Sequence, residues 1–300
     1  MKKVLPLFTT CAILSGCFGS GSEEYNDSIK DHSSYDCHNQ TFDPNSVRST
    51  SEVKYISCDI ENFTNGDLSG LALFENLESL SIGNRNQSPD KVVFDSDWTP
   101  KLKRLYLDTV KFETFSLSAM KEVERISIYY SEMPEINVTN LSMLTHLIIG
   151  NTNLELETLD LSYNPEIELL LIRNTNIKDL TFANNDKLSE IMLGAVNSRT
   201  IELINLPSLR ILNMYDGVLE KLYIDLPSLE YASIYNNKLT SVDFSGSPEL
   251  SGLALSNNLI TDINVDVNEK LTSLDLTGNP LSEKTKAYLD TLTWIEDLKY

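Results

Sequence analysis

Cysteine and histidine are the residues of this chain most able to bind a metal or to act as a nucleophile, and they are few. The 300 residues include four cysteines and three histidines. His146 is far along the chain from His32 and His38 and has no cysteine or carboxylate partner within its own stretch of sequence. Cysteine and histidine show no spacing typical of a metal site. We therefore expect no metal, no cofactor and no enzymatic activity.

The charge balance is strongly acidic. Aspartate and glutamate outnumber lysine and arginine by 44 to 24, which gives a formal net charge of −20. A nucleic-acid-binding protein needs a basic surface that neutralises phosphates. The composition therefore argues against a nucleic-acid partner, while 41% hydrophobic residues are enough for a sizeable core.

The first residues, MKKVLPLFTTCAILSGC, have the order of a secretory signal: two lysines, a short apolar run and small residues. The ending LSGC resembles the bacterial lipobox, in which the cysteine becomes the lipid-modified first residue of the mature protein. The resemblance implies a signal peptide over 1–16 and lipid, such as palmitate, on Cys17. Ordinary secretory cleavage at a nearby site is the alternative. Phe18, in place of an aspartate after the cysteine, favours outer-membrane sorting in a two-membrane bacterium, so we expect a lipid-anchored protein of the cell envelope.

Two cysteines remain once the signal peptide and the lipid are accounted for. Cys37 and Cys58 form an even pair in a chain sent to an oxidising compartment, which predicts a disulfide. Two buried free thiols are the alternative. Residues 17–34 are rich in glycine, serine and charge, which predicts a flexible tether.

The rest of the sequence repeats with a period of about 21 residues. Apolar residues occupy positions 1, 4 and 6 of each unit and recur at positions 11, 14 and 16, an alternation typical of strands. Prolines at the unit ends argue against helices. The leading residues of the units are Leu77, Leu102, Val123, Leu144, Ile167, Leu188, Leu209, Leu229, Leu250 and Leu271.

This pattern, LxxLxLxxNxL, resembles the leucine-rich repeat family, and the short units resemble its internalin-like bacterial branch. The resemblance implies a mainly β solenoid of about ten to eleven coils. It also implies an asparagine at position 9 that bonds to backbone groups between coils. The last three units have Asn237, Asn258 and Asn279 there. Earlier units depart from the pattern, with Thr152, Thr175, Val196 and Gly217.

Both ends of such an array need a cap, because terminal coils would expose apolar faces. We expect the repeats to span 77–281. Residues 35–76 should form an N-terminal cap with one or two irregular coils, in which Cys58 points inward to pair with Cys37. Residues 282–300 predict an amphipathic helix that closes the last coil, with Ser282 as its N-cap.

Positions 3, 5 and 7 of each unit should face the concave side of the solenoid. At position 5, Ile148, Leu171 and Met192 are predicted to form an apolar row on solvent. The other predicted binding residues on this face are Tyr106, Tyr129, Leu169, Arg173, Ile211, Tyr215, Tyr231 and Tyr235. An exposed apolar patch rimmed by tyrosine and arginine is typical of a protein-binding site.

We therefore expect a protein-binding module, with membrane contact through the lipid anchor alone. A glycan- or cell-wall-binding module is one alternative, because the tyrosines could stack on sugar rings. A structural or adhesive spacer is the other. In that case the aliphatic row is a passive ladder that favours strand formation.

Overall fold

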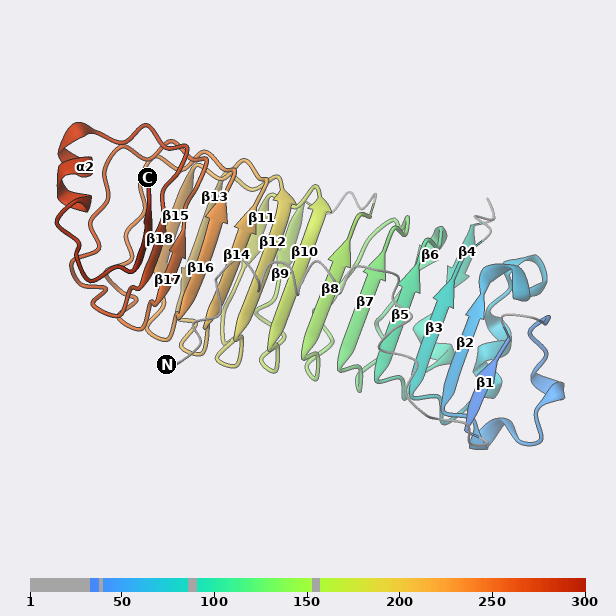
Figure 1. Ribbon diagram of the computed structural model, residues 1–300. Helices are drawn as coiled ribbons and strands as arrows, with labels where there is room; N and C mark the ends of the chain where they lie inside the picture. The colour runs from blue at the N-terminus through green and yellow to red at the C-terminus, as the bar shows by residue number, and fades with distance from the viewer. Residues whose placement is uncertain (1–32, 38–39, 86–90, 153–156) are drawn as a thin grey trace.

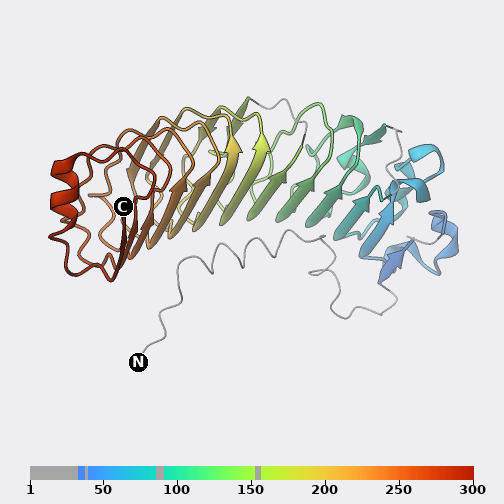
Figure 2. The ribbon, with the colours of Figure 1, turned by 45° about the horizontal axis from the view of Figure 1, so that its top comes forward.

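The protein is a curved solenoid built around one large parallel sheet (Figures 1 and 2). The computed structural model describes residues 33–37, 40–85, 91–152 and 157–300. Each coil contributes one strand, so that the sheet has 13 strands in the order β1-β2-β3-β5-β7-β8-β10-β12-β14-β16-β17-β18-β19. The large sheet lines the inner, concave side of the curve, and the return segments lie on the outer side (Figure 2). The mainly β leucine-rich repeat architecture predicted from the sequence is confirmed.

The strands of the large sheet follow the repeat period. They are β1 (Ser34–Asp36), β2 (Tyr55–Asp59), β3 (Ser79–Gly83), β5 (Arg104–Asp108), β7 (Arg125–Tyr129), β8 (His146–Gly150), β10 (Leu169–Thr175), β12 (Glu190–Val196), β14 (Ile211–Tyr215), β16 (Tyr231–Tyr235), β17 (Gly252–Ala254), β18 (Ser273–Asp275) and β19 (Asp297–Lys299). Positions 4 and 6 point inward, as in Leu105 and Leu107, which are 2% and 0% exposed. Like positions of adjacent coils lie in register, so the core is a stack of aliphatic layers.

The return segments form short strand pairs in part of the array. These pairs are β4 (Val92–Phe94) with β6 (Phe112–Phe115), β9 (Thr158–Asp160) with β11 (Asp179–Thr181), and β13 (Thr200–Ile204) with β15 (Lys221–Asp225). The predicted strand or extended conformation is therefore found on the outer side. Between residues 239 and 281 the return segments form no strands.

The asparagine at position 9 bonds adjacent coils together, as the repeat pattern implied. Asn258 donates from Nδ2 to the carbonyl oxygens of Ile234 and Leu255, at 2.7 and 3.0 Å. Its Oδ1 accepts the backbone N–H of Leu239 at 3.1 Å. Asn237 and Asn279 make equivalent bonds. One buried amide thus satisfies three backbone groups of two coils, which would otherwise be costly to bury.

A second asparagine ladder occupies the opposite corner and was missed in the sequence. Asn164, Asn185 and Asn268 are fully buried, and each lies three residues before a leading apolar residue. Asn268 donates to the carbonyl oxygens of Phe244 and Ser247, at 3.0 and 2.9 Å. This recurrence was visible in the sequence and marks the turn that leads into the next strand.

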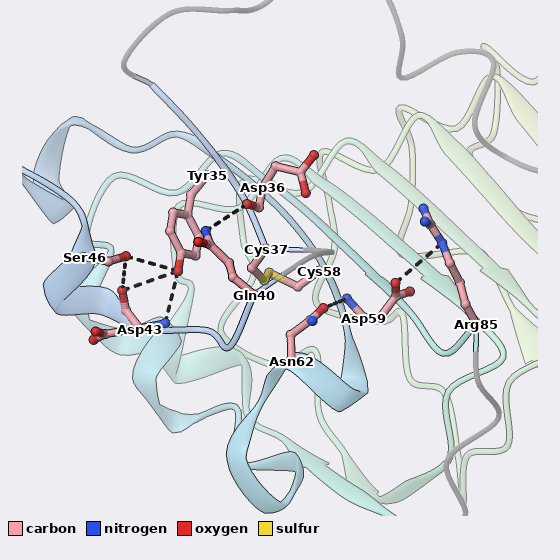
Figure 3. Close-up of a disulfide and its surroundings, with 10 residues drawn as sticks. All are labelled: Tyr35, Asp36, Cys37, Gln40, Asp43, Ser46, Cys58, Asp59, Asn62 and Arg85. Atoms are coloured by element: carbon pink, nitrogen blue, oxygen red, sulfur yellow. Dashed lines mark hydrogen bonds and ion pairs between the residues drawn. A yellow bond between two sulfur atoms is a disulfide. The ribbon is translucent and has the colours of Figure 1, made fainter.

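The N-terminal cap is closed by a disulfide between Cys37 and Cys58 (Figure 3). Both cysteines are fully buried, and their Cα atoms are 4.9 Å apart. The Cys37 N–H donates to the Ser57 carbonyl, and this backbone hydrogen bond continues the pairing of β1 with β2 up to the disulfide. The predicted disulfide is confirmed.

Short 3₁₀ helices and aromatic rings fill the rest of this cap. The helices in this part of the chain are η1 (Pro44–Ser46), η2 (Thr50–Glu52), η3 (Ile60–Asn62), η4 (Thr64–Gly66) and η5 (Ser69–Leu73), and η6 (Ser96–Trp98) follows in the next coil. Phe42 packs against Phe63 and Phe74, with ring centroids 4.6 and 5.8 Å apart. The Tyr35 hydroxyl accepts the Asp43 N–H at 3.1 Å (Figure 3).

The C-terminal cap differs from the helix predicted over 282–300. Ser282 is the N-cap as predicted, and its Oγ accepts the Thr285 N–H at 3.1 Å. The helix α2 (Glu283–Leu289) then ends after two turns. The chain returns to the sheet as β19, which pairs with β18. The strand bonds available at the open edge of β18 explain why the last residues leave the helix.

Candidate functional site on the concave sheet

The three outward positions of each strand form three rows across the concave sheet. At position 5, Leu171 pairs in register with Ile148 on one side and with Met192 on the other. The structure therefore brings the predicted aliphatic row together. These side chains lie outside the buried core of the solenoid, because they point to the other face of the strands.

The prediction that the aliphatic row lies on solvent is wrong for two of its three members. Leu171 is 8% exposed and Met192 is 4% exposed, while Ile148 is half-buried. Neighbouring strands of a sheet are only about 4.8 Å apart, so in-register aliphatic side chains cover one another. A charge introduced at Leu171 or Met192 would therefore lower the stability of the fold in addition to changing the concave surface.

Tyrosines form two ring pairs on either side of this row. The centroids of Tyr106 and Tyr129 are 6.0 Å apart, with the ring planes tilted by 49°. Tyr215 and Tyr235 are stacked, with centroids 5.5 Å apart and planes within 10° of parallel. All four rings are half-buried, which leaves part of each ring open to a partner.

Two glycines at position 7 make room for the tyrosine rings. A Cβ placed on Gly194 would lie 2.6 Å from Cζ of Tyr215, and a Cβ on Gly150 would lie 3.1 Å from Cδ1 of Tyr129. Each ring therefore lies over the backbone of the adjacent strand. Arg173 on β10 is in register with both glycines, so it lies between Gly150 on one neighbouring strand and Gly194 on the other. The need for glycine here was not apparent from the repeat pattern.

Burial changes the acidity of two groups on this face. Burial raises the pKa of Tyr106 to about 12, and the nearby Asp108 carboxylate and Tyr129 add to the effect. Burial also raises the pKa of Glu190. Both side chains are half-buried although they point away from the core, and this partial removal from water is what raises the two pKa values.

The remaining predicted residues lie on the same face. Leu169 and Ile211 are half-buried at position 3, and Tyr231 is 41% exposed. Arg104 and Arg125 were not predicted as site residues, and they are exposed at position 3 of β5 and β7. His146 follows them in register on β8, with its Nδ1 2.9 Å from the Thr145 hydroxyl.

Comparison with known proteins bears on the fold alone. No protein-family model and no curated protein matches the sequence. Among solved structures, the functional domain of InlJ from Listeria monocytogenes is similar, with a TM-score of 0.51 and 16% identity over 78% of this chain and 56% of that chain. TLR13 in a complex with ssRNA13 has a TM-score of 0.60 and 18% identity over 81% of this chain and 40% of that one.

A third similar structure contains the leucine-rich repeat protein FLRT2, in an octameric complex with Latrophilin 3 and Unc5D. It has a TM-score of 0.59 and 14% identity over 83% of this chain and 84% of the matched chain. The chain spans about half the length of the first two proteins. The fold is a leucine-rich repeat solenoid, and its neighbours include an internalin.

The structure does not describe the part of the chain that carries the predicted signal peptide and lipid anchor. Cys17 and the signal peptide over 1–16 lie outside the described residues, as does most of the tether over 17–34. Within the part that the structure describes, no helix is long and apolar enough to cross a bilayer.

Proposed function

We propose that this protein is a binding module that recognises another protein with its concave sheet. The observation that carries the proposal is the pair of tyrosine clusters, Tyr106 with Tyr129 and Tyr215 with Tyr235, on a rigid sheet. Half-buried aromatic side chains supply much contact area at a low entropic cost, and they are enriched among residues that dominate binding energy. The complexes formed by similar folds, such as FLRT2 with Latrophilin 3 and Unc5D, support this kind of role.

The proposed role is recognition without catalysis, and the proposed location is the bacterial cell envelope. Lipid on Cys17 would hold the mature protein at a membrane, favouring the outer membrane because of Phe18. Labelled palmitate tests the anchor. It should enter the wild-type protein and should not enter Cys17→Ala. Labelling of the variant, or no labelling of the wild type, would overturn the anchor without touching the proposed binding role.

The binding role is tested by affinity capture from envelope extracts. The bait is the chain from residue 17 onward with Cys17→Ser, which keeps every described residue. The test variant combines Tyr215→Ala and Tyr235→Ala. The control is Tyr223→Ala, because Tyr223 is 50% exposed on β15 of the outer side. A protein retained by the wild type and the control but lost by the test variant supports the proposal.

If the wild type, the control and the test variant all retain the same protein equally, the concave tyrosines are not the binding site. Glycan binding is distinguished by repeating the capture with purified cell-wall polysaccharide. Tyrosine-dependent retention of the polysaccharide, with no protein retained, would replace the proposed function by the glycan-binding one. No capture of either kind would favour the spacer.

A further inference from the structure

Two arginines lie side by side on the concave sheet. Arg104 on β5 is in register with Arg125 on β7, and both are exposed at position 3 of their coils. Adjacent strands are about 4.8 Å apart, so the two side chains start as direct neighbours. His146 continues the same row on β8. We call Arg104 and Arg125 the arginine pair.

Like charges directly opposite one another destabilise a sheet. Among the paired strands of the described residues, no other in-register pair has like charges, and neighbouring coils repeatedly pair opposite charges instead. Among the described residues, the cross-coil ion pairs of this kind include Lys103–Glu78, Lys178–Glu157, Lys187–Glu166, Arg199–Glu220, Arg210–Glu230 and Lys270–Glu249. With 44 acidic residues against 24 basic ones, acidic partners are abundant. The arginine pair is therefore a local departure from the charge pattern of this protein.

No carboxylate of the described residues forms an ion pair with either arginine. Arg104 instead lies over the Tyr55 ring, with Cζ 6.0 Å from the ring centroid. Asp108 is on the same face of β5 but four residues further on, which is about 13 Å along a strand. Its Oδ1 accepts the Thr109 hydroxyl at 2.9 Å. Both guanidinium groups are thus available to an external ligand.

We propose that the arginine pair recognises an acidic segment of the partner protein. This inference rests on the proposed function and specifies the chemistry of the partner. A guanidinium binds a carboxylate through two parallel hydrogen bonds, and two adjacent guanidinium groups favour neighbouring carboxylates. Tyr106 and Tyr129 lie beside the pair on the same strands and provide aromatic contact for the same segment. Charge complementarity would also select this site on a protein whose net charge repels acidic ligands elsewhere.

A labelled decaglutamate peptide tests the proposal by fluorescence anisotropy. The wild-type chain from residue 17 with Cys17→Ser should bind this peptide at about 0.15 M salt, where a Debye length of about 8 Å screens the repulsion from the acidic charges elsewhere on the protein. Arg104→Gln combined with Arg125→Gln should lower the affinity about tenfold or more, because two charge-assisted contacts are lost. The matched control is Lys178→Gln combined with Arg199→Gln, which removes the same charge from exposed, ion-paired residues. The control should change the affinity less than about twofold.

Two results would overturn the inference. One is a wild-type protein that does not bind decaglutamate at about 0.15 M salt. The other is equal binding by the wild type and the Arg104→Gln, Arg125→Gln variant. Circular dichroism of each variant shows whether the fold is kept.

The envelope capture separates failure of this inference from failure of the proposed function. If the arginine variant retains the tyrosine-dependent partner as well as the wild type does, the binding role stands and the acidic segment is wrong. If no tyrosine-dependent protein is captured by any bait, the binding role itself fails, and the inference fails with it.

Discussion

The ring of Tyr215 lies over Gly194 of the adjacent strand, so closely that a Cβ on residue 194 would be 2.6 Å from Cζ of the ring. The same ring stacks on Tyr235 from the other side. Glycine thus determines where an aromatic side chain of the proposed binding surface lies. The apolar repeat pattern inside the coil would permit many residues at position 194, but the position of the Tyr215 ring requires a residue without a side chain.

Gly194→Ala should displace the Tyr215 ring and weaken its stacking on Tyr235. We expect a loss of about 1–2 kcal/mol in the free energy of unfolding, as for other overpacked sites. Urea denaturation measures this loss. The control is the same substitution in a Tyr215→Ala background, where the cost should nearly vanish. An undiminished cost in that background would show that the ring is not what opposes the Cβ.

Asn258→Ala should destabilise the protein by about 2–4 kcal/mol, because three buried backbone groups lose their partner. Chemical denaturation gives the value. Asn176→Ala is the matched control, since Asn176 is exposed and accepts a single bond from Asn197. Its effect should stay within about 0.5 kcal/mol. Similar losses for both variants would contradict a structural role specific to position 9.

Ala195→Gly should stabilise the protein. Ala195 has φ of 50°, in the left-handed region, at a corner where other coils place residues such as Asn236 and Gly278. Relief of about 1–2 kcal/mol of backbone strain should exceed the entropic cost of a glycine, leaving a gain of about 0.5–1 kcal/mol. Ala183→Gly, at an exposed position outside the left-handed set of the described residues, should instead be destabilising. Thermal denaturation of both variants provides the comparison.

The Tyr106 hydroxyl should contribute a pH-dependent part of the stability at alkaline pH. Its pKa is raised from 10.0 to about 12 in the folded protein. The folded state therefore holds this proton more tightly, and the contribution is present in full below pH 10. It is lost as the pH rises from 10 to about 12. Tyr106→Phe should remove this fall from the stability curve measured by denaturation, whereas Tyr223→Phe should leave it. Identical curves for wild type and Tyr106→Phe would rule out the shift.

The repeat period made much of the fold predictable. Positions 1, 4 and 6 of each unit are apolar because they fill the core, so their spacing identified the strands. The disulfide was predicted from two cysteines left over in a chain that we expect to be exported, and Ser282 was identified as a cap from its residue type. Predictions of this kind succeed because one residue type meets one local physical requirement.

The missed features depend on relationships between coils. Leu171 and Met192 were expected on solvent because the alternation of the strand places them on the concave face. Their exposure also depends on the side chains of the neighbouring strands, which cover them. The space that Gly150 and Gly194 leave for tyrosine rings is likewise a property of two adjacent coils. The arginine pair became apparent once the register of β5 and β7 was known.

The position-9 ladder has a consequence for how the solenoid comes apart. In a repeat array each coil contacts its neighbours alone, so the interfaces between coils set the local resistance to unfolding. In the C-terminal coils Asn237, Asn258 and Asn279 join those interfaces, whereas among the described residues the buried hydroxyls of Thr152 and Thr175 have no hydrogen-bond partner. We therefore expect the position-9 contacts around Thr152 and Thr175 to open more readily than those of the C-terminal coils, so that the chain on either side would unfold as separate cooperative units.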